Sequence, residues 1–394
     1  MKEISVFKEL RSFLLLWSSQ AVSELGTAMV NFALIIWIHE QQGTASSVTL
    51  LTLCSFLPTI LFRFVAGALA DAWNKKRIML LADALAACGT GVIWLLFSKD
   101  ALQIGHIYVI NVLLSFMNAF QVPAAYTATS LLVPQKHYSR AGGLQGFSGA
   151  AISILSPALG GVLLAVGGLD AVLLFDLVSF SIALLVLLFF IKIPEQKQKP
   201  KAQREPFVSR LTDGIHYLKG NKALLHLILC MTIVNFLAKL GGDGMLSPFV
   251  LSKTGNNEQV LGLVQSFVAV GLLAGSLIMT LMQPAKNKIR TVFITLTLTF
   301  SGNVLLGLTH RPWLWCVGNF ISYLFAAIMN AHLSAIMREQ VPIEMQGRVF
   351  SARDTLQNGA IPLGLFLGGV LADHVFEPFI AAPSPLQKML LPLF

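Results

Sequence analysis

Charged residues are scarce in this chain. They make up 12% of its 394 residues, against about 25% in an ordinary soluble domain. Hydrophobic residues make up 55%, and the mean hydropathy is +0.72. This balance excludes a soluble globular protein and indicates an integral membrane protein.

Cysteine is also rare, and all four cysteines fall inside apolar runs: Cys54, Cys88, Cys230 and Cys316. That placement argues against a disulfide framework and against a metal site. The phosphate-cradling pattern GxxxxGK[ST] does not occur, so we expect neither ATP as the direct energy source nor a cofactor. No cleavable signal is evident, because no small-residue cleavage site follows the first apolar run.

Long apolar runs make up most of the sequence. A helix needs about 20 apolar residues to cross a bilayer. The sequence predicts eleven such spans, near 12–38, 46–70, 78–98, 105–132, 141–167, 170–192, 223–251, 258–282, 290–309, 312–337 and 349–372.

The net charge of +9 could point to nucleic acid, but the cations lie in short loops between the apolar runs and not on one surface. Of the 28 Lys and Arg residues, most fall in loops on the N-terminal side of the membrane. Only Lys99, Lys253, Arg311 and Lys388 fall on the other side. Positive charge favours the cytoplasm, so we expect a multi-pass inner-membrane protein with a cytoplasmic N-terminus and no nucleic-acid partner.

The longest loop, 193–222, is basic and polar and then amphipathic from Phe207 to Leu218. It predicts a short helix on the cytoplasmic membrane surface. We therefore expect an N-terminal six-helix bundle at 1–192, a linker at 193–222, and a C-terminal bundle at 223–394 with five spans and a tail.

The two halves repeat each other. VPQKHYSR at 133–140 matches VPIEMQGR at 341–348, and GGVL at 160–163 matches GGVL at 368–371, both at an offset of 208 residues. Two matches at one offset indicate duplication. Parallel repeats are a transporter architecture in which the substrate site lies between the halves at mid-membrane.

Several motifs carry a family resemblance over essentially the whole chain. GALADAWNKKR at 67–77 resembles the loop between spans two and three of the major facilitator superfamily, and ILSPALGG at 154–161 resembles its fifth-span motif. WSSQAVSELGTAMVNFALIIW and GRVFSARDTLQNGAIPLGLFLGGVLAD resemble its macrolide-efflux and siderophore-exporter branch. The resemblance implies twelve spans; the segment after Asp373 is short and proline-rich, so we expect the twelfth to be absent from this chain.

A helix C-terminus disfavours the Asp71 carboxylate, which needs a partner there. Lys75 to Arg77 are candidates, although they also serve as positive-inside anchors. The resemblance implies that Asp71 instead docks on the start of span eleven while the cytoplasmic side is closed. The expected gating residues are therefore Gly67, Asp71, Lys75, Lys76, Arg77, Arg348 and Arg353.

Charges inside a membrane are costly and indicate function. Glu24 lies near the midplane of span one, where the long side chain of Arg63 could reach it; the pair is either a coupling site or permanently neutralised. Lys239 and Asp243 lie four residues apart in span seven, which also fits a simple ion pair. Asp83 and Asp176 lie near span ends, where structural roles are expected.

The fifth-span motif predicts a bend and a close-packed hinge at Pro157, Gly160 and Gly161, which also fits ordinary helix packing. Polar and aromatic residues at mid-span depth are candidates for the substrate cavity, or for hydrogen bonds between helices. They are Gln20, Asn31, Asn118, Gln121, Asn235, Gln265 and Tyr323.

The sequence thus predicts an all-α membrane protein with two pseudo-symmetric six-helix bundles. We expect a monomeric multidrug antiporter, not an enzyme, that exports amphipathic small molecules in exchange for protons. One alternative is an intramembrane serine hydrolase that uses Ser148; another is a remnant that no longer transports. The sequence does not identify the substrate or the coupling ion.

Overall fold

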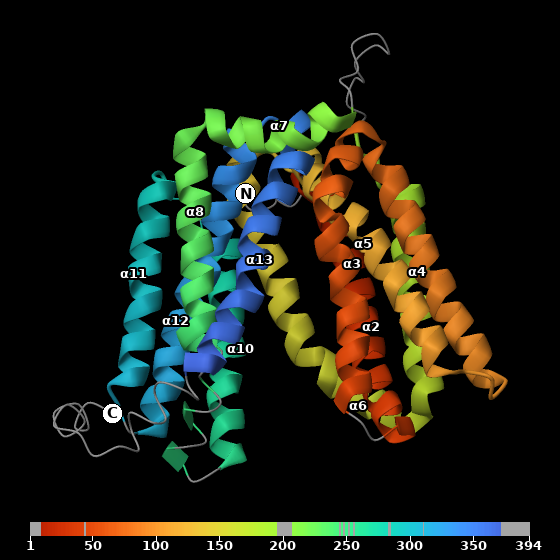
Figure 1. Cartoon of the computed structure of the whole chain (residues 1–394). Coiled ribbons are helices and arrows are strands. Elements are labelled where there is room, and N and C mark those ends of the chain that lie inside the picture. Colours follow the sequence, from red (N-terminus) through yellow and green to blue (C-terminus); the bar gives the residue numbers. More distant parts are fainter. Residues whose placement is uncertain are drawn as a thin grey trace. The chain divides into compact units, whose positions relative to one another are not determined.

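The computed structural model describes residues 9–42, 45–194, 207–243, 246, 249–250, 253–254, 257–282, 285–309 and 311–371. The regular structure within these ranges is helical (Figure 1). The α-helices are α2 (Arg11–Gln42), α3 (Ala45–Ala72), α4 (Lys75–Ser98), α5 (Ile104–Leu132), α6 (Tyr138–Leu185), α7 (Phe207–Gly220), α8 (Lys222–Leu237), α10 (Glu258–Leu281), α11 (Lys288–Gly307), α12 (Pro312–Gln340) and α13 (Gln346–Leu371). Short 3-10 helices η1 (Gln135–His137) and η5 (Ile343–Met345) and π-helices η2 (Val186–Phe190) and η4 (Ala238–Asp243) complete the order.

In the described part of the chain, eight helical stretches are long and apolar enough to cross a membrane. One of them, Gln135–Phe190, holds two expected spans, which meet at Gly168 with a φ of 65°. Helices α3 and α13 cover two further expected spans. The chain is therefore a multi-pass membrane protein, and the predicted all-α class is confirmed; the tail at 372–394 lies outside the described residues.

Span seven differs from its prediction. A continuous helix over 223–251 was expected, but α8 ends at Leu237 and the π-helix η4 follows. Helix α13 packs closely against this change of geometry, because a Cβ added to Gly364 would lie 2.7 Å from Phe236 O. A wide π-turn suits such a contact, and π-turns are frequent at functional positions.

Asparagine side chains fix several helix starts. The Oδ1 atoms of Asn74, Asn221 and Asn287 accept from backbone amides three residues later, at 3.0, 3.2 and 3.0 Å. Each bond satisfies one of the amides that a helix start leaves without a partner, which stabilises a helix by about 1 kcal/mol. These caps explain why α4, α8 and α11 begin at Lys75, Lys222 and Lys288.

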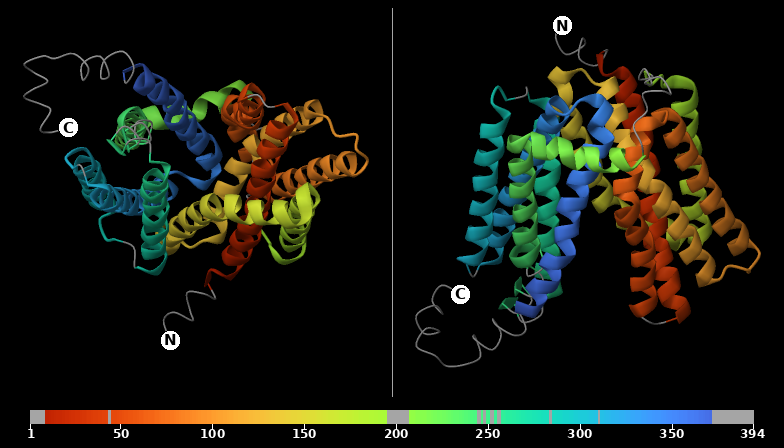
Figure 2. Two further views of the ribbon diagram at one scale, coloured as in Figure 1. Left: turned by 90° about the horizontal axis from the view of Figure 1, so that it is seen from below. Right: turned by 45° about the horizontal axis from the view of Figure 1, so that its top comes forward.

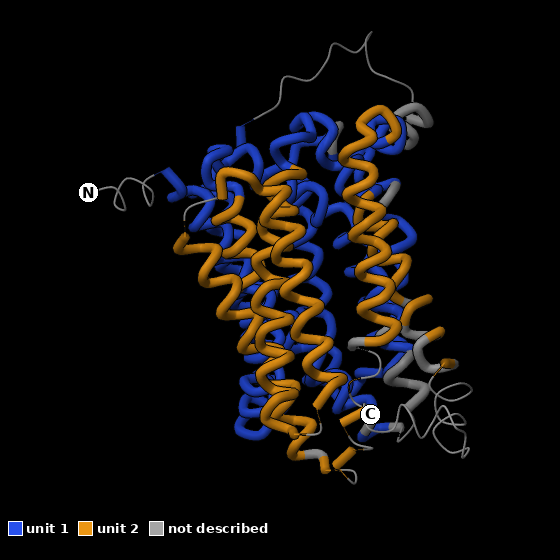
Figure 3. Tube along the Cα trace, turned by 90° about the vertical axis from the view of Figure 1, so that its left-hand side faces the viewer, with its two compact units in different colours: residues 1–138, 148–218, 338–352 blue, residues 139–147, 219–337, 353–394 orange. Residues whose placement is uncertain are grey.

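The chain forms two compact units, coloured separately in Figure 3. Unit 1 comprises residues 1–138, 148–218 and 338–352, and unit 2 comprises 139–147, 219–337 and 353–394. Each unit thus includes a short segment from the other half of the sequence. The division into bundles at 1–192 and 223–394 stays a prediction.

Two apolar cores lie among the described residues of unit 1, and Figure 2 shows its helices from two further sides. Leu16, Ala66, Met79, Ala124 and Leu187 belong to the core near the α5–α6 connection. The second core, toward the α4–α5 connection, contains Met29, Leu34, Ile93, Ile107 and Val172. Buried polar contacts join α3 to α5, since Thr59 Oγ1 donates to Ser115 O at 2.7 Å.

The part of unit 2 that the structure describes also contains apolar cores. One contains Leu227, Met231, Val292, Met329 and Leu333, and another contains Val250, Val264, Trp315 and Cys316. Helices α11 and α12 approach closely, because a Cβ on Gly302 would lie 2.9 Å from Ser322 N.

The predicted duplication is visible in the connections. Helix α5 ends at Leu132, η1 follows, and α6 starts at Tyr138; helix α12 ends at Gln340, η5 follows, and α13 starts at Gln346. Every one of these bounds repeats at the offset of 208. His137 N donates to Pro134 O, and Met345 N donates to Pro342 O, both at 2.9 Å.

Candidate functional site: a gate contact and a buried carboxylate

The loop motif brings α3 against the start of α13. Gly67 is buried, and a Cβ added to it would lie 2.6 Å from Gly347 O and from Ser351 Cβ. Only glycine permits this approach, and it lies one turn before Asp71. The side chain of Asp71 lies outside the described residues, so its docking on α13 stays a prediction.

The three cations after Asp71 have different surroundings. Lys76 Nζ donates to Leu188 O at 2.9 Å and to Ile191 O at 2.8 Å. It therefore satisfies carbonyls at the end of η2, where a helix terminus favours a positive charge. Lys75 is buried and Arg77 is exposed. Lys76 thus has a structural contact inside unit 1.

The linker helix α7 docks on the segment that joins α12 to α13. Arg348 Nη1 donates to Asp213 Oδ2 at 2.7 Å, and a Cβ on Gly214 would lie 2.9 Å from Arg348 O. Tyr217 Oη donates to Gln340 O at 2.6 Å. One face of α7 carries Asp213, Gly214 and Tyr217. This face therefore packs against the end of α12 and the start of α13. Arg353, also on α13, bonds its neighbour Asp354 at 2.6 Å.

Sequence reasoning missed Arg338, which it placed among the loop cations. The side chain is buried, at 2% exposure. Its Nη1 donates to Tyr126 O and to Ser130 Oγ, both at 2.7 Å. Its Cζ lies 5.8 Å from the ring centroids of Tyr126 and Phe350. The repeat could have indicated it, because Arg338 and Ser130 are 208 residues apart.

Glu24 lies beside a buried carboxylate. Asp83 of α4 is 1% exposed and accepts from Gln20 Nε2 at 2.9 Å and from Gln121 Nε2 at 2.7 Å. Glu24, one turn after Gln20 on α2, is exposed and repels the Asp83 carboxylate. The Asp83 carboxylate thus contributes to the electrostatic surroundings of Glu24, and the expected contact of Glu24 with Arg63 stays a prediction.

Asp176 is a second buried carboxylate of unit 1, also at 1% exposure. It accepts from Thr90 Oγ1 at 2.7 Å and from Thr27 Oγ1 at 3.4 Å. Gly26 packs against it, since an added Cβ would lie 2.7 Å from Asp176 Oδ1. Both aspartates thus accept hydrogen bonds from neutral donors on other helices.

Lys239 lies in η4, opposite Gly364 of α13, with its Cβ 3.1 Å from a Cβ added there. The side chain of Asp243 lies outside the described residues. The remaining cavity candidates vary in exposure. Asn118 and Gln265 are exposed, and Asn31, Asn235 and Tyr323 are half-buried.

The glycines of the fifth-span helix fall into two kinds. Gly142 and Gly143 touch other helices of unit 2, because added Cβ atoms would lie 3.1 Å from Ala331 O and 2.9 Å from Thr280 N. Within unit 1, a Cβ added to Gly160 would lie 3.2 Å from the ring of Phe32. A Cβ added to Gly161 would lie 3.9 Å from the same ring, which is an ordinary contact distance. Pro157 is exposed within α6. Close packing applies to Gly160, while a bend at Pro157 stays a prediction.

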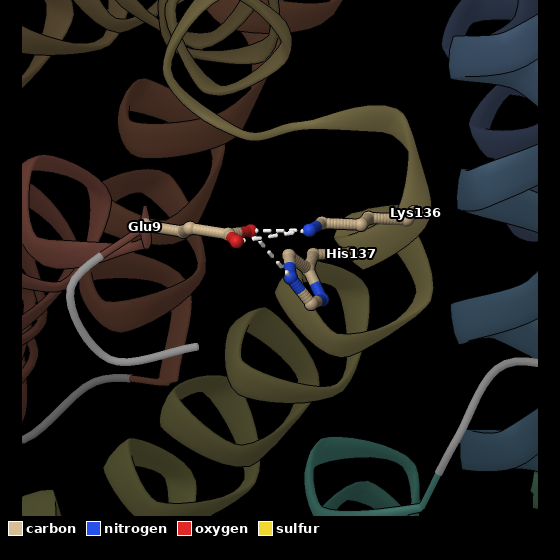
Figure 4. Close-up of polar contacts among 3 residues, drawn as sticks. All are labelled: Glu9, Lys136 and His137. Atoms are coloured by element: carbon tan, nitrogen blue, oxygen red, sulfur yellow. Dashed lines mark hydrogen bonds and ion pairs between the residues drawn. The ribbon is translucent and has the colours of Figure 1, made fainter. Parts of the chain in front are cut away.

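A polar cluster also ties the start of the chain to the α5–α6 connection (Figure 4). Glu9 Oε2 lies 2.7 Å from Lys136 Nζ and 3.2 Å from His137 Nε2. The hydrogen bond from Lys136 holds the pKa of Glu9 below its ordinary value. No sequence motif predicted this contact.

The comparisons with known proteins agree with this architecture. The family model of the Major Facilitator Superfamily matches residues 16–242 and 231–382. Macrolide efflux protein A of Streptococcus pyogenes is 27% identical over 371 residues, which cover 92% of this chain and 90% of that protein. Multidrug efflux pump Tap of Mycobacterium tuberculosis is 24% identical over 390 residues, which cover 95% and 90%.

Two solved structures share the fold. A bacterial homologue of the iron transporter ferroportin, in an outward-facing state, superposes with a TM-score of 0.72 at 13% identity and covers 92% of this chain and 93% of its own. The human organic anion transporter MFSD10 superposes with a TM-score of 0.69 at 15% identity and covers 92% of each chain.

Proposed function

Because the chain belongs to the Major Facilitator Superfamily, we propose that it exports amphipathic small molecules by alternating access, in exchange for protons. The observation that carries this proposal is the similarity to efflux proteins over nine-tenths of both chains. Macrolides are the first substrates to test, because a macrolide efflux protein is among these relatives.

The proposed topology places the N-terminus, the connection 133–137 and the connection 341–345 in the cytoplasm. The excess of Lys and Arg in these loops supports it. The contact of Gly67 with Gly347 and Ser351 then forms part of a cytoplasmic gate. We define this gate as the contacts of α13 residues 346–352 with α3 and α5.

The proton is proposed to be taken up at Glu24. Two features support this role: the side chain is exposed within a membrane span, and a buried carboxylate lies beside it. Carboxylates that share a site titrate as a coupled pair. Gln20 and Gln121 hold Asp83 in place, so Asp83 is proposed to position the pair. Asp243 is the second coupling candidate.

Efflux from cells that lack their own drug exporters tests the proposal. Cells that express the chain should accumulate less macrolide than cells with an empty vector, and a protonophore should remove the difference. The export proposal would be refuted if the expressing cells exported none of a panel of macrolides, siderophores and cationic dyes. Efflux that persists with the protonophore would refute the proton coupling alone.

The serine hydrolase alternative finds no support in the geometry that the structure describes. Ser148 is buried in α6, and the Nδ1 atom of His332 lies 2.9 Å from Ile328 O of its own helix. A hydrolase needs a histidine within reach of the serine. The family assignment therefore decides for the transporter.

A further inference from the structure

Arg338 carries a permanent charge and yet is buried near the end of α12. Its guanidinium makes two hydrogen bonds of 2.7 Å to α5, one to Tyr126 O and one to Ser130 Oγ. It also lies over two aromatic rings, those of Tyr126 and Phe350, at 5.8 Å. These rings contact each other edge to face, with centroids 5.5 Å apart. One side chain thus joins α5, α12 and α13.

Neighbouring hydrogen bonds fix the backbone of this cluster. Gln346 Nε2 donates to Arg338 O at 3.2 Å and to Val341 O at 3.1 Å, so the first residue of α13 holds the end of α12. Tyr138 Oη donates to Ser130 O at 3.2 Å in the same way at the end of α5. Both ends are therefore well ordered around the guanidinium.

Burying a charge costs free energy that hydrogen bonds to carbonyl and hydroxyl oxygens only partly recover. An apolar side chain of similar size would avoid that cost, so stability alone does not explain an arginine here. The requirement is different for a contact that must form and break during transport. When such a contact opens, water in the cavity solvates the released guanidinium, whereas it would not solvate an apolar side chain. Such a residue favours reversible closure over permanent packing.

We infer that Arg338 is the central latch of the cytoplasmic gate: it joins α5 to α12 and α13 while the gate is closed and releases Tyr126 and Ser130 when the gate opens. The inference rests on the proposed function only for alternating access. It does not depend on the substrate.

The test measures thiol labelling in purified protein in nanodiscs without substrate. The reporter is Ser351→Cys, on a background without the four native cysteines. Ser351 is 1% exposed and faces Gly67 across the gate. A second reporter, Ser179→Cys, is 2% exposed inside unit 1, where Gly26 packs against it. Labelling at Ser179→Cys reports general loosening.

The latch variants are Arg338→Gln and Ser130→Ala. Arg338→Gln removes the charge and the ring contacts, and Ser130→Ala removes one acceptor. The matched control is Thr127→Val, which also removes a buried hydroxyl of α5. Thr127 is 1% exposed, and its hydroxyl donates only to Pro123 O of its own helix, at 3.1 Å.

Loss of a hydrogen bond to a charged group should raise labelling of Ser351→Cys about tenfold in Ser130→Ala and more in Arg338→Gln. Thr127→Val should leave it unchanged, and Ser179→Cys should label at the wild-type rate throughout. Unchanged labelling of the gate reporter in both latch variants overturns the inference. An equal rise at Ser179→Cys, or in Thr127→Val, overturns it as well. If this labelling pattern holds but the cells show no efflux, the proposed function is refuted, while the inference about Arg338 still stands.

Discussion

The guanidinium of Arg338 donates to the hydroxyl of Ser130 at 2.7 Å, and the two residues hold equivalent positions in the two repeats, 208 residues apart. The bonds from Tyr138 to Ser130 O and from Gln346 to Arg338 O are also equivalent in the repeats. The two repeats thus share these hydrogen bonds at the helix ends, although the side chains that donate them differ.

The Gly67 contact predicts a steep cost for the smallest substitution. Gly67→Ala places a methyl group 2.6 Å from Gly347 O, and overpacking of this kind costs about 1–3 kcal/mol. The closed gate should lose roughly tenfold to a hundredfold in population, so efflux should slow and labelling of Ser351→Cys should rise.

Gly161→Ala is the matched control for Gly67→Ala, because its new methyl group has room at 3.9 Å. It should retain the wild-type rate of efflux and the wild-type labelling of Ser351→Cys. Equal behaviour of the two alanine variants would mean that α3 and α13 need no close contact.

The carboxylates of unit 1 predict different effects of removing a charge. Glu24→Gln should abolish efflux driven by a pH gradient while the protein stays folded, because the proposed proton acceptor is lost. Asp83→Asn should change the pH profile of efflux, since it removes the charge that Glu24 faces. Efflux rates between pH 5.5 and 8.5 in vesicles measure both.

Asp176→Asn is the control for Asp83→Asn. Both aspartates are 1% exposed and accept two hydrogen bonds from neutral side chains, so both variants lose similar local contacts. Asp176→Asn should keep the wild-type pH profile. If the two asparagine variants shift the profile alike, burial and not the neighbouring Glu24 is responsible.

The ion pair between Asp213 and Arg348 predicts that α7 is held by charge. Both side chains are partly exposed, at 27% and 13%, so solvent screening limits the contribution to about 1 kcal/mol. Proteolysis of α7 should therefore speed up about fivefold in Asp213→Asn. The effect should shrink at 1 M salt, where the Debye length falls to about 3 Å.

A double-mutant cycle checks that assignment. If the pair acts as a unit, Arg348→Gln should add little to Asp213→Asn. Additive effects would show that Asp213 and Arg348 act on α7 independently, each through other partners, and not as an ion pair.

Glu9 predicts a pH dependence of stability. The hydrogen bond from Lys136 lowers the folded-state pKa of Glu9 below its ordinary value of 4.5. The stabilising contribution is therefore complete above pH 4.5 and is lost as the pH falls through the lower folded-state value. Thermal unfolding in detergent should show this loss in the wild type and not in Glu9→Gln.

Lys136→Gln provides the reciprocal check, because it removes the nearer partner and leaves the carboxylate with His137. Its unfolding temperature should depend less on pH than that of the wild type and should move toward that of Glu9→Gln across the same pH range. A wild-type pH profile in either variant would contradict the assignment to this pair.

The spans were predictable because length and hydropathy determine them, and the 208-residue offset found in the sequence recurs in the bounds of the two connections. Periodicity cannot show how far a helix keeps one geometry, so the π-turn at η4 was missed. The contact of Glu24 with Arg63 stays a prediction, because depth in the membrane does not fix the rotation of a helix about its axis. Arg338 was missed because burial of a cation near a helix end depends on α5 and α13, which lie far away in the sequence.

Unit 1 includes residues 338–352, and this has a consequence for biosynthesis. A ribosome that has released Leu218 has made all the spans of the first bundle, and Lys76 can already cap η2. The surface that receives Phe350 and Arg338 must wait until more than a hundred further residues have been inserted. During that interval the rings and carbonyls of α5 face lipid or water without their final partners.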